Sequence, residues 1–182
     1  MAESFSNKLT RAAGIVTTSS SGSIGITTTI ITGISTVGVA VSDLIDNANF
    51  IAGTKVTGYG DAASQVVVDQ TSTNTAAVSG SAIVNFLGMT TAYTSAAATK
   101  SILIGGTFAN NTDSSVNLTV QLYDNSVTTE VGIAAKIPVP NGSSFVISDA
   151  GKTVMEASDE IRIYCDSEGA IDATLSILTG VS

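Results

Sequence analysis

Apolar residues occupy every second position over long stretches of this chain, and this period of two restricts the possible folds more than any other feature. The segments 116–122 (VNLTVQL), 161–165 (IRIYC) and 171–177 (IDATLSI) all alternate in this way. Such alternation places the apolar side chains on one face of a β-strand. Turn signals such as Asn141-Gly142 separate the strands at spacings of about 8–12 residues. The pattern predicts a β-sandwich or jelly roll over residues 100–182.

The composition extends the β prediction to the whole chain. Charged residues make up only 12% of the 182 residues, about half the usual share. Ser and Thr take their place, and Thr and Val favour strands because they are branched at Cβ. The fold class is therefore predicted to be all-β. Strands in the first half of the chain are expected at 24–31, 37–42, 54–59, 64–69 and 82–88.

The chain divides into four segments by composition. Residues 1–22 are predicted to form an N-terminal arm, and residues 23–89 a first small β-domain in which 43–47 forms a tight or helical turn. Residues 90–99 carry no charge and have almost only small side chains, so they are predicted to form a linker. Residues 100–182 form the C-terminal β-sandwich domain, in which Asp149-Ala150-Gly151 is expected to turn.

The N-terminal arm contains the candidate assembly residues. Phe5 and Leu9 could mark one face of a short helix, with Lys8 and Arg11 on another side. An arm this polar gains little by packing on its own domain, so it is expected to become ordered against a neighbouring subunit. Deleting residues 1–20 would then abolish assembly and leave the fold intact.

The residues needed for most catalytic chemistry are absent. The chain contains no His, and its single Cys165 lies in an alternating strand, where a small core residue is expected. Dinucleotide, phosphate-loop and CxxC motifs are missing. The acidic groups Asp43/Asp46, Glu156/Asp159/Glu160 and Asp166/Glu168 are interpreted as solvated turn acids, with calcium binding at the first or third as an alternative. No catalytic residue, cofactor or metal site is predicted.

The charge distribution argues against nucleic acid and membranes as partners. The net charge is −8, and the seven basic residues are scattered, with no two adjacent. A basic stripe for phosphate contacts is therefore lacking. No apolar run reaches the roughly 18 residues that span a bilayer, and the N-terminal segment lacks the apolar stretch of a secretory signal. The chain is expected to stay in the cytoplasm in which it is made, or to leave by lysis.

Several segments resemble structural proteins of tailed bacteriophages. These are the opening AESFSNKLTRAAGIVTT, the segment TGISTVGVAVSDLIDNANFIAGTKV, the stretch 100–124, and the turns at 138–143 and 155–161. The likeness is greatest to virion proteins of contractile-tailed phages that infect marine cyanobacteria, and it extends over nearly the whole chain. It implies a virion component with no catalytic residues, assembled in the host cytoplasm.

Within that resemblance, the chain is expected to be an accessory subunit of the tail or neck, or a capsid decoration protein. Its partners would be other virion proteins and copies of itself. An alternative is a receptor- or carbohydrate-binding module at a fibre or tail tip, although aromatic residues make up only 5% of the chain. A third hypothesis is a cellular surface-layer or filament subunit, a class for which a secretion signal would be expected.

Overall fold

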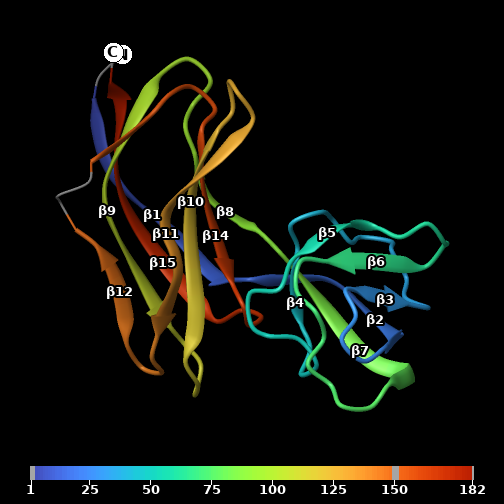
Figure 1. Cartoon of the computed structure of the whole chain (residues 1–182). Helices are drawn as coiled ribbons and strands as arrows, with labels where there is room; N and C mark the ends of the chain where they lie inside the picture. The colour runs from blue at the N-terminus through green and yellow to red at the C-terminus, as the bar shows by residue number, and fades with distance from the viewer. Residues whose placement is uncertain (1–2, 149–151, 182) are drawn as a thin grey trace. The chain divides into compact units, whose positions relative to one another are not determined.

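The computed structural model describes residues 3–148 and 152–181, and the secondary structure in this part of the chain consists of strands and turns. The strands form three antiparallel sheets, which confirms the all-β prediction. The chain separates into two compact units (Figure 1). The first, here called the sandwich unit, contains residues up to Gly14, Met89–Cys165 and the residues from Gly169 onward. The second, here called the small unit, contains Ile15–Gly88 and Asp166–Glu168.

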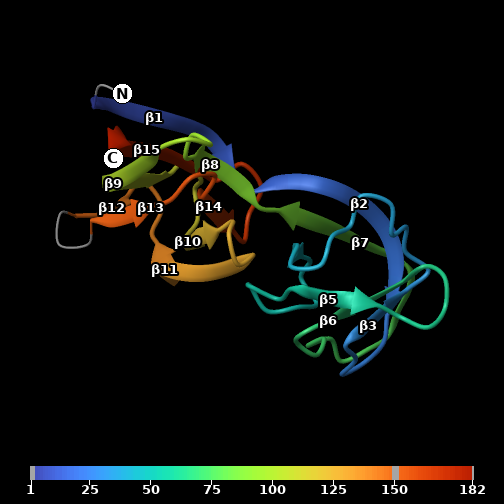
Figure 2. The ribbon, with the colours of Figure 1, turned by 90° about the horizontal axis from the view of Figure 1, so that it is seen from above.

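The sandwich unit consists of two facing sheets. The first is ordered β1-β15-β9-β12, with β13 also paired to β9, and the second is ordered β11-β10-β14-β8. The first and last strands of the chain are therefore neighbours (Figures 1 and 2). The strands of this unit are β1 (Ser4–Ala13), β8 (Thr90–Thr94), β9 (Lys100–Asn110), β10 (Val116–Asp124), β11 (Thr129–Val139), β12 (Ser144–Ile147), β13 (Thr153–Met155), β14 (Glu160–Cys165) and β15 (Ile171–Val181).

The core of the sandwich unit lies between its two sheets. Leu103 and Phe108 of β9 contribute from one sheet, and Leu118 of β10 contributes from the other; all three are fully buried. The alternation in the sequence explains this core, because the apolar residues of each strand share the inward face. Cys165 is buried in the same core, in agreement with the interpretation as a small core residue. A bulge in the β9–β15 pairing lies beside Gly105. The consecutive glycines Gly105 and Gly106 indicate a bulge at this point of the sequence.

The small unit has one six-stranded sheet, ordered β4-β7-β2-β3-β6-β5, and a separate core. Phe86 of β7 and Ile31 of β3 are fully buried within that core. The hairpin predicted around Tyr59-Gly60-Asp61 is present, because β5 and β6 pair on either side of it. The strands of this unit are β2 (Ile15–Ile24), β3 (Ile30–Thr32), β4 (Leu44–Asp46), β5 (Val56–Tyr59), β6 (Gln65–Val68) and β7 (Val78–Gly88).

The N-terminal segment differs from the predicted arm. Residues Ser4–Ala13 form β1, which pairs with β15 over its length, and Ile15–Ile24 form β2 of the small unit. The physical reason is the period of the segment, since apolar residues four positions apart share a side in a strand as well as in a helix. The predicted arm 1–22 is thus divided at Gly14 between two sheets.

The predicted linker 90–99 and three predicted elements of the first half also differ. The predicted strand 24–31 includes the turn between β2, which ends at Ile24, and β3, which begins at Ile30. Thr90–Thr94 form β8, because they pair with β14 despite their small side chains. Residues 37–42 form turns instead of a strand, with positive φ at Gly38 (82°) and Ser42 (77°). Within 43–47 the structure contains β4 instead of a turn. The turn predicted at Asp149-Ala150-Gly151 lies outside the described residues.

Candidate assembly surface

The strand β1 forms one edge of the five-stranded sheet. It pairs with β15 on one side, and no described strand pairs with its other side. The pairing with β15 is regular from Ser4 to Thr10 and contains a bulge before Ala13. An unpaired edge exposes backbone N–H and C=O groups that can join another strand. Over most of its length β1 is therefore a surface that can accept a partner strand.

The structure places the four predicted assembly residues on two sides of β1. Phe5 and Leu9 point outward and are 59% and 77% exposed, and Arg11 is also exposed. Lys8 alternates with them on the other side of the strand, where it is half-buried. The spacing expected for one helix face therefore becomes the outward face of a strand, with Lys8 separated from the other three.

Phe5 and Leu9 belong to a larger surface on the side of the five-stranded sheet that points away from the core. We call this surface the outer face and define it by three rows of residues. The strand register aligns its residues in three rows across the sheet. The rows are Phe5–Leu178–Ile102–Val154, Asn7–Ser176–Gly105, and Leu9–Thr174–Thr107–Val146. None of these residues is charged.

The outer-face residues beyond β1 are not among the assembly residues predicted from the sequence. Val146 on β12 and Val154 on β13 are 55% and 54% exposed. Alternation predicts that these two valines point outward, because their neighbours Phe145 and Met155 face the core. The strand order, which brings these two residues into the same rows as Phe5 and Leu9, cannot be derived from a single sequence.

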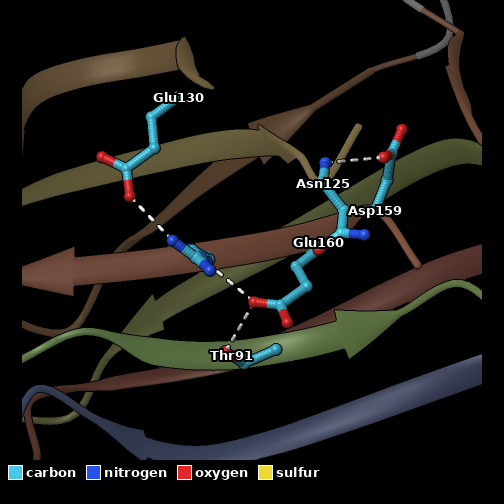
Figure 3. A network of polar contacts seen from close by, with 6 residues as sticks. Thr91, Asn125, Glu130, Asp159 and Glu160 are labelled. Atoms are coloured by element: carbon cyan, nitrogen blue, oxygen red, sulfur yellow. Dashed lines mark hydrogen bonds and ion pairs between the residues drawn. The ribbon is translucent and has the colours of Figure 1, made fainter. Parts of the chain in front are cut away.

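The other sheet of the sandwich unit has a polar network on its outward side (Figure 3). The Arg162 guanidinium donates through Nε to Glu160 Oε2 at 2.7 Å and through one terminal nitrogen to Glu130 Oε1 at 2.8 Å. It also lies 3.5 Å from the ring centroid of Tyr123. The Thr91 hydroxyl donates to Glu160. The network thus connects all four strands of this sheet.

The charge of Arg162 is held firmly within this network. Partial burial lowers the pKa of Arg162, but the hydrogen bonds and negative charges of Glu160 and Glu130 outweigh that effect, so the pKa is raised above its usual value. Both carboxylates are occupied by the same cation. The arrangement therefore links the strands of this sheet through side chains as well as through the backbone.

Two further acids from the groups named in the sequence, Asp159 and Asp43, also have structural partners. Asp159 is buried, and its two carboxylate oxygens accept the backbone N–H groups of Asn125 and Glu156. Asp43 is buried in the small unit, where one oxygen accepts the Ala40 N–H and the Thr17 hydroxyl. These carboxylates therefore fix turns.

No group of three or more His, Cys, Asp or Glu side chains within residues 3–148 and 152–181 is placed to hold a metal ion. In the same part of the chain, no helix has the length and apolar character that crossing a bilayer requires.

Comparison with known proteins identifies no family for the chain. No protein-family model matches the sequence, and no curated protein matches it. Two solved structures from infectious bursal disease virus are distantly similar. The VP2 subviral particle has a TM-score of 0.34 at 9% identity, covering 97% of this chain and 72% of that one. The T13 viral particle has a TM-score of 0.35 at 9% identity, covering 99% and 69%. Similarity at this level does not assign a function.

Proposed function

We propose that the chain is a non-enzymatic structural subunit of a bacteriophage virion. The observation that carries the proposal is the uncharged outer face of the sandwich unit, together with the open edge of β1. Exposed apolar surface next to an unpaired strand is a feature that proteins usually cover by association. Contacts formed by neutral side chains and backbone pairing depend little on salt, which suits a permanent particle.

The kind of particle follows from the sequence resemblance. The segments similar to virion proteins of contractile-tailed cyanobacterial phages include the opening that forms β1. The chain is an accessory subunit of the tail or neck, or a capsid decoration protein. It assembles in the host cytoplasm with other virion proteins and with copies of itself, through β1 and the outer face.

The use of the acidic residues supports a non-enzymatic role. Asp159 and Asp43 accept backbone N–H groups, and Glu160 and Glu130 share the Arg162 cation. A glycosidase requires two carboxylates that face each other across a cleft. These four acids instead make hydrogen bonds or ion pairs within the fold.

The alternative role, carbohydrate or receptor binding at a fibre or tail tip, gains no support from the aromatic side chains. The Tyr123 ring is covered by the Arg162 guanidinium, and Tyr164 is 2% exposed. The Tyr93 hydroxyl is hydrogen-bonded to that of Ser101. The exposed aromatic residues among those described are Phe5 and Tyr59, which belong to different units. Sugar affinity in the purified protein would favour the alternative.

Immunogold labelling of purified phage with an antibody against this chain tests the proposal. Label on the particle is expected, and its position on the head, neck or tail distinguishes the two structural roles. A purified particle without label, with the protein detected by mass spectrometry in the lysate alone, would contradict a virion role.

A pair of matched variants then tests the surface. Replacing both Phe5 and Leu9 with Ser is expected to reduce incorporation into particles severalfold, because it removes exposed apolar contacts from the outer face. Ile83→Ser is the control, since Ile83 is 63% exposed on β7 of the small unit. Equal incorporation of the two variants would remove β1 from the assembly surface.

A further inference from the structure

We propose that β1 pairs with β1 of a second copy of this chain, antiparallel, about a twofold axis at Asn7. This inference deepens the proposed function by naming the partner of the open edge, and it rests on that function only in assuming that the chain assembles. The pairing itself is a property of the isolated protein.

The availability of β1 is the first argument. Residues Ser4–Thr10 are regularly paired to β15 on one side and have no described strand on the other. The segment contains neither Pro nor Gly. The edge strand β11 differs, because it contains Pro138 and two register shifts against β10, and such features prevent the addition of a strand. Strand addition is therefore expected at β1 and not at β11.

The sequence of β1 is the second argument, because it is complementary to itself. In an antiparallel pair centred on Asn7, each residue lies opposite the residue whose number makes the sum 14. Phe5 then lies opposite Leu9 of the second copy, and Asn7 opposite Asn7. Phe5 and Leu9 are the two apolar side chains that β1 exposes, so each would cover the other across the new strand pair.

The charges that flank the segment Ser4–Thr10 match in the same register, Glu3 just before β1 and Arg11 just after Thr10, where the pairing with β15 becomes irregular. Glu3 lies opposite Arg11 of the second copy, and the symmetry produces this contact twice. Both residues are exposed, and within the described part of the chain neither forms an ion pair. Opposite charges directly across a strand pair are favourable, and like charges are unfavourable. The two ion pairs therefore fix the ends of the paired segment.

The neighbouring registers lack this match. A pair centred on residue 8 would place Lys8 opposite Lys8, which is repulsive. A pair centred on residue 6 would place Glu3 opposite Leu9 and leave Arg11 without a partner. In the register centred on Asn7, Lys8 lies opposite Ser6, which is neutral. Charge therefore selects one register, as edge strands require if they are to pair in one way only.

Pairing in this register also joins the two outer faces. A twofold axis perpendicular to the sheet keeps the outward side chains of both copies on the same side. The row that ends in Phe5 then continues into the row that begins with Leu9 of the second copy. The product is one ten-stranded sheet, counting five strands from each copy. A single strand pair buries less than the roughly 1,200 Å² of a stable interface, so a weak dimer is expected.

Disulfide crosslinking of single-cysteine variants tests the pairing in the full chain. Across an antiparallel pair the two Asn7 Cα atoms lie about 4.5–5.5 Å apart, within the range that a disulfide spans. The native Cys165 is fully buried, so the introduced thiol is the reactive one. Under mild oxidation, Asn7→Cys is expected to form a covalent dimer at least about tenfold faster than the control.

The matched control is Ser176→Cys. Ser176 lies beside Asn7 on β15 and points outward in the same way. Its hydroxyl donates a hydrogen bond to Asn7 Oδ1. In the paired dimer the two Ser176 residues lie three interstrand spacings apart, about 14 Å, which a disulfide cannot span. Dimerisation of Asn7→Cys that is no faster than that of Ser176→Cys would overturn the proposal.

The register is tested by mixing two variants. Phe5→Cys and Leu9→Cys are each expected to stay monomeric alone, because identical positions lie about 13 Å apart along the strand. A mixture of the two is expected to give the heterodimer, since position 5 faces position 9 of the second copy. Crosslinking of either variant alone, or none in the mixture, would overturn the register.

Charge reversal provides a test without cysteines. Glu3→Arg and Arg11→Glu are each expected to raise the dimer dissociation constant roughly three- to tenfold, because each creates two like-charge contacts. The double variant restores the opposite charges and is expected to recover the original affinity in sedimentation experiments. A double variant as weak as the single variants would contradict the Glu3–Arg11 contact.

The outcomes also separate this inference from the proposed function. A protein that labels the virion but shows no Asn7 crosslink would pair β1 with a different virion protein, which rejects the twofold pairing alone. A protein that crosslinks at Asn7 but is absent from particles would keep the pairing and reject the virion role.

Discussion

At the scale of single residues, Arg162 is the side chain at the centre of the ion pairs in the sandwich unit. Its side chain is 17% exposed, and it bonds both Glu130 and Glu160. Removing it leaves two carboxylates near one another without a cation. We expect Arg162→Ala to lower the free energy of unfolding of the sandwich unit by about 1–3 kcal/mol, measured by urea denaturation.

The exposed pair Lys100–Glu156 is the control for that experiment. Its side chains are 48% and 58% exposed, and its distance of 2.9 Å is similar to those of the Arg162 pairs. Solvent screens such a pair, so Lys100→Ala is expected to change stability by less than about 1 kcal/mol. If both variants lost the same free energy of unfolding, burial would not determine how much these ion pairs contribute to stability.

Asp124 provides a pH dependence at the same scale. The Ser126 hydroxyl and backbone N–H donate to its carboxylate and lower the pKa of Asp124 below its ordinary 3.8. A group with a lowered folded pKa stabilises the protein above its unfolded pKa, and this contribution is lost as pH falls through the folded value. Asp124→Asn is therefore expected to destabilise the protein above pH 3.8, with the difference vanishing at lower pH.

Nuclear magnetic resonance titration of the Asp124 carboxyl group checks the cause. Ser126→Ala removes the hydroxyl donor and is expected to raise the pKa of Asp124 toward its ordinary value. An unchanged titration midpoint in that variant would rule out the Ser126 hydroxyl as the source of the shift.

At the scale of elements, the sequence predicts strands well where alternation is long and poorly where spacing is ambiguous. The segment 116–122 has one interpretation, because only a strand places its four apolar residues on one side. The spacing of Phe5 and Leu9 has two interpretations, because residues four positions apart share a side in a helix and in a strand. Their strand form depends on pairing with β15, whose residues lie between 165 and 173 positions away (Leu9↔Thr174, Phe5↔Leu178) and are not part of any local pattern.

Tertiary contacts also determine the secondary structure of segments with weak local signals. Residues 90–99 lack bulk and are predicted to form a linker, yet Thr90–Thr94 pair with β14 and place Tyr93 against the core. In the opposite case, residues 37–42 have the composition of a strand but form turns, where Asp43 accepts the Ala40 N–H. In both segments distant or polar contacts outweigh propensity.

The role of β1 in the sandwich unit changes the expected result of deleting it. If residues 1–20 formed an arm, their removal would leave the fold intact. Because β1 pairs with β15 and Ala13 lies in the core, we expect deletion of residues 1–13 to lower the melting temperature of the sandwich unit or to prevent its folding. Circular dichroism during heating measures this.

Point variants separate folding from assembly within the same strand. Leu9→Ser changes a side chain that is 77% exposed, so it is expected to shift stability by no more than about 0.5 kcal/mol. A deletion variant that melts like the intact chain would show that β1 is dispensable for the fold.

At the scale of the whole molecule, the two cores are the organising feature. Leu118 is buried in the core of the sandwich unit, and Phe86 in that of the small unit. Each core is closed within its own sheets, so each unit contains the apolar burial that cooperative unfolding requires. The chain is therefore expected to show two unfolding transitions.

Cavity-forming substitutions assign the two transitions. Leu118→Ala is expected to destabilise the sandwich unit by about 2–5 kcal/mol, and Phe86→Ala the small unit by about 3–5 kcal/mol, because each removes a fully buried side chain. In differential scanning calorimetry each variant should lower one transition and leave the other in place. If both variants lowered the same single transition by similar amounts, the two units would unfold as one. In that case the chain, although divided by its strand pairings, would be a single thermodynamic domain.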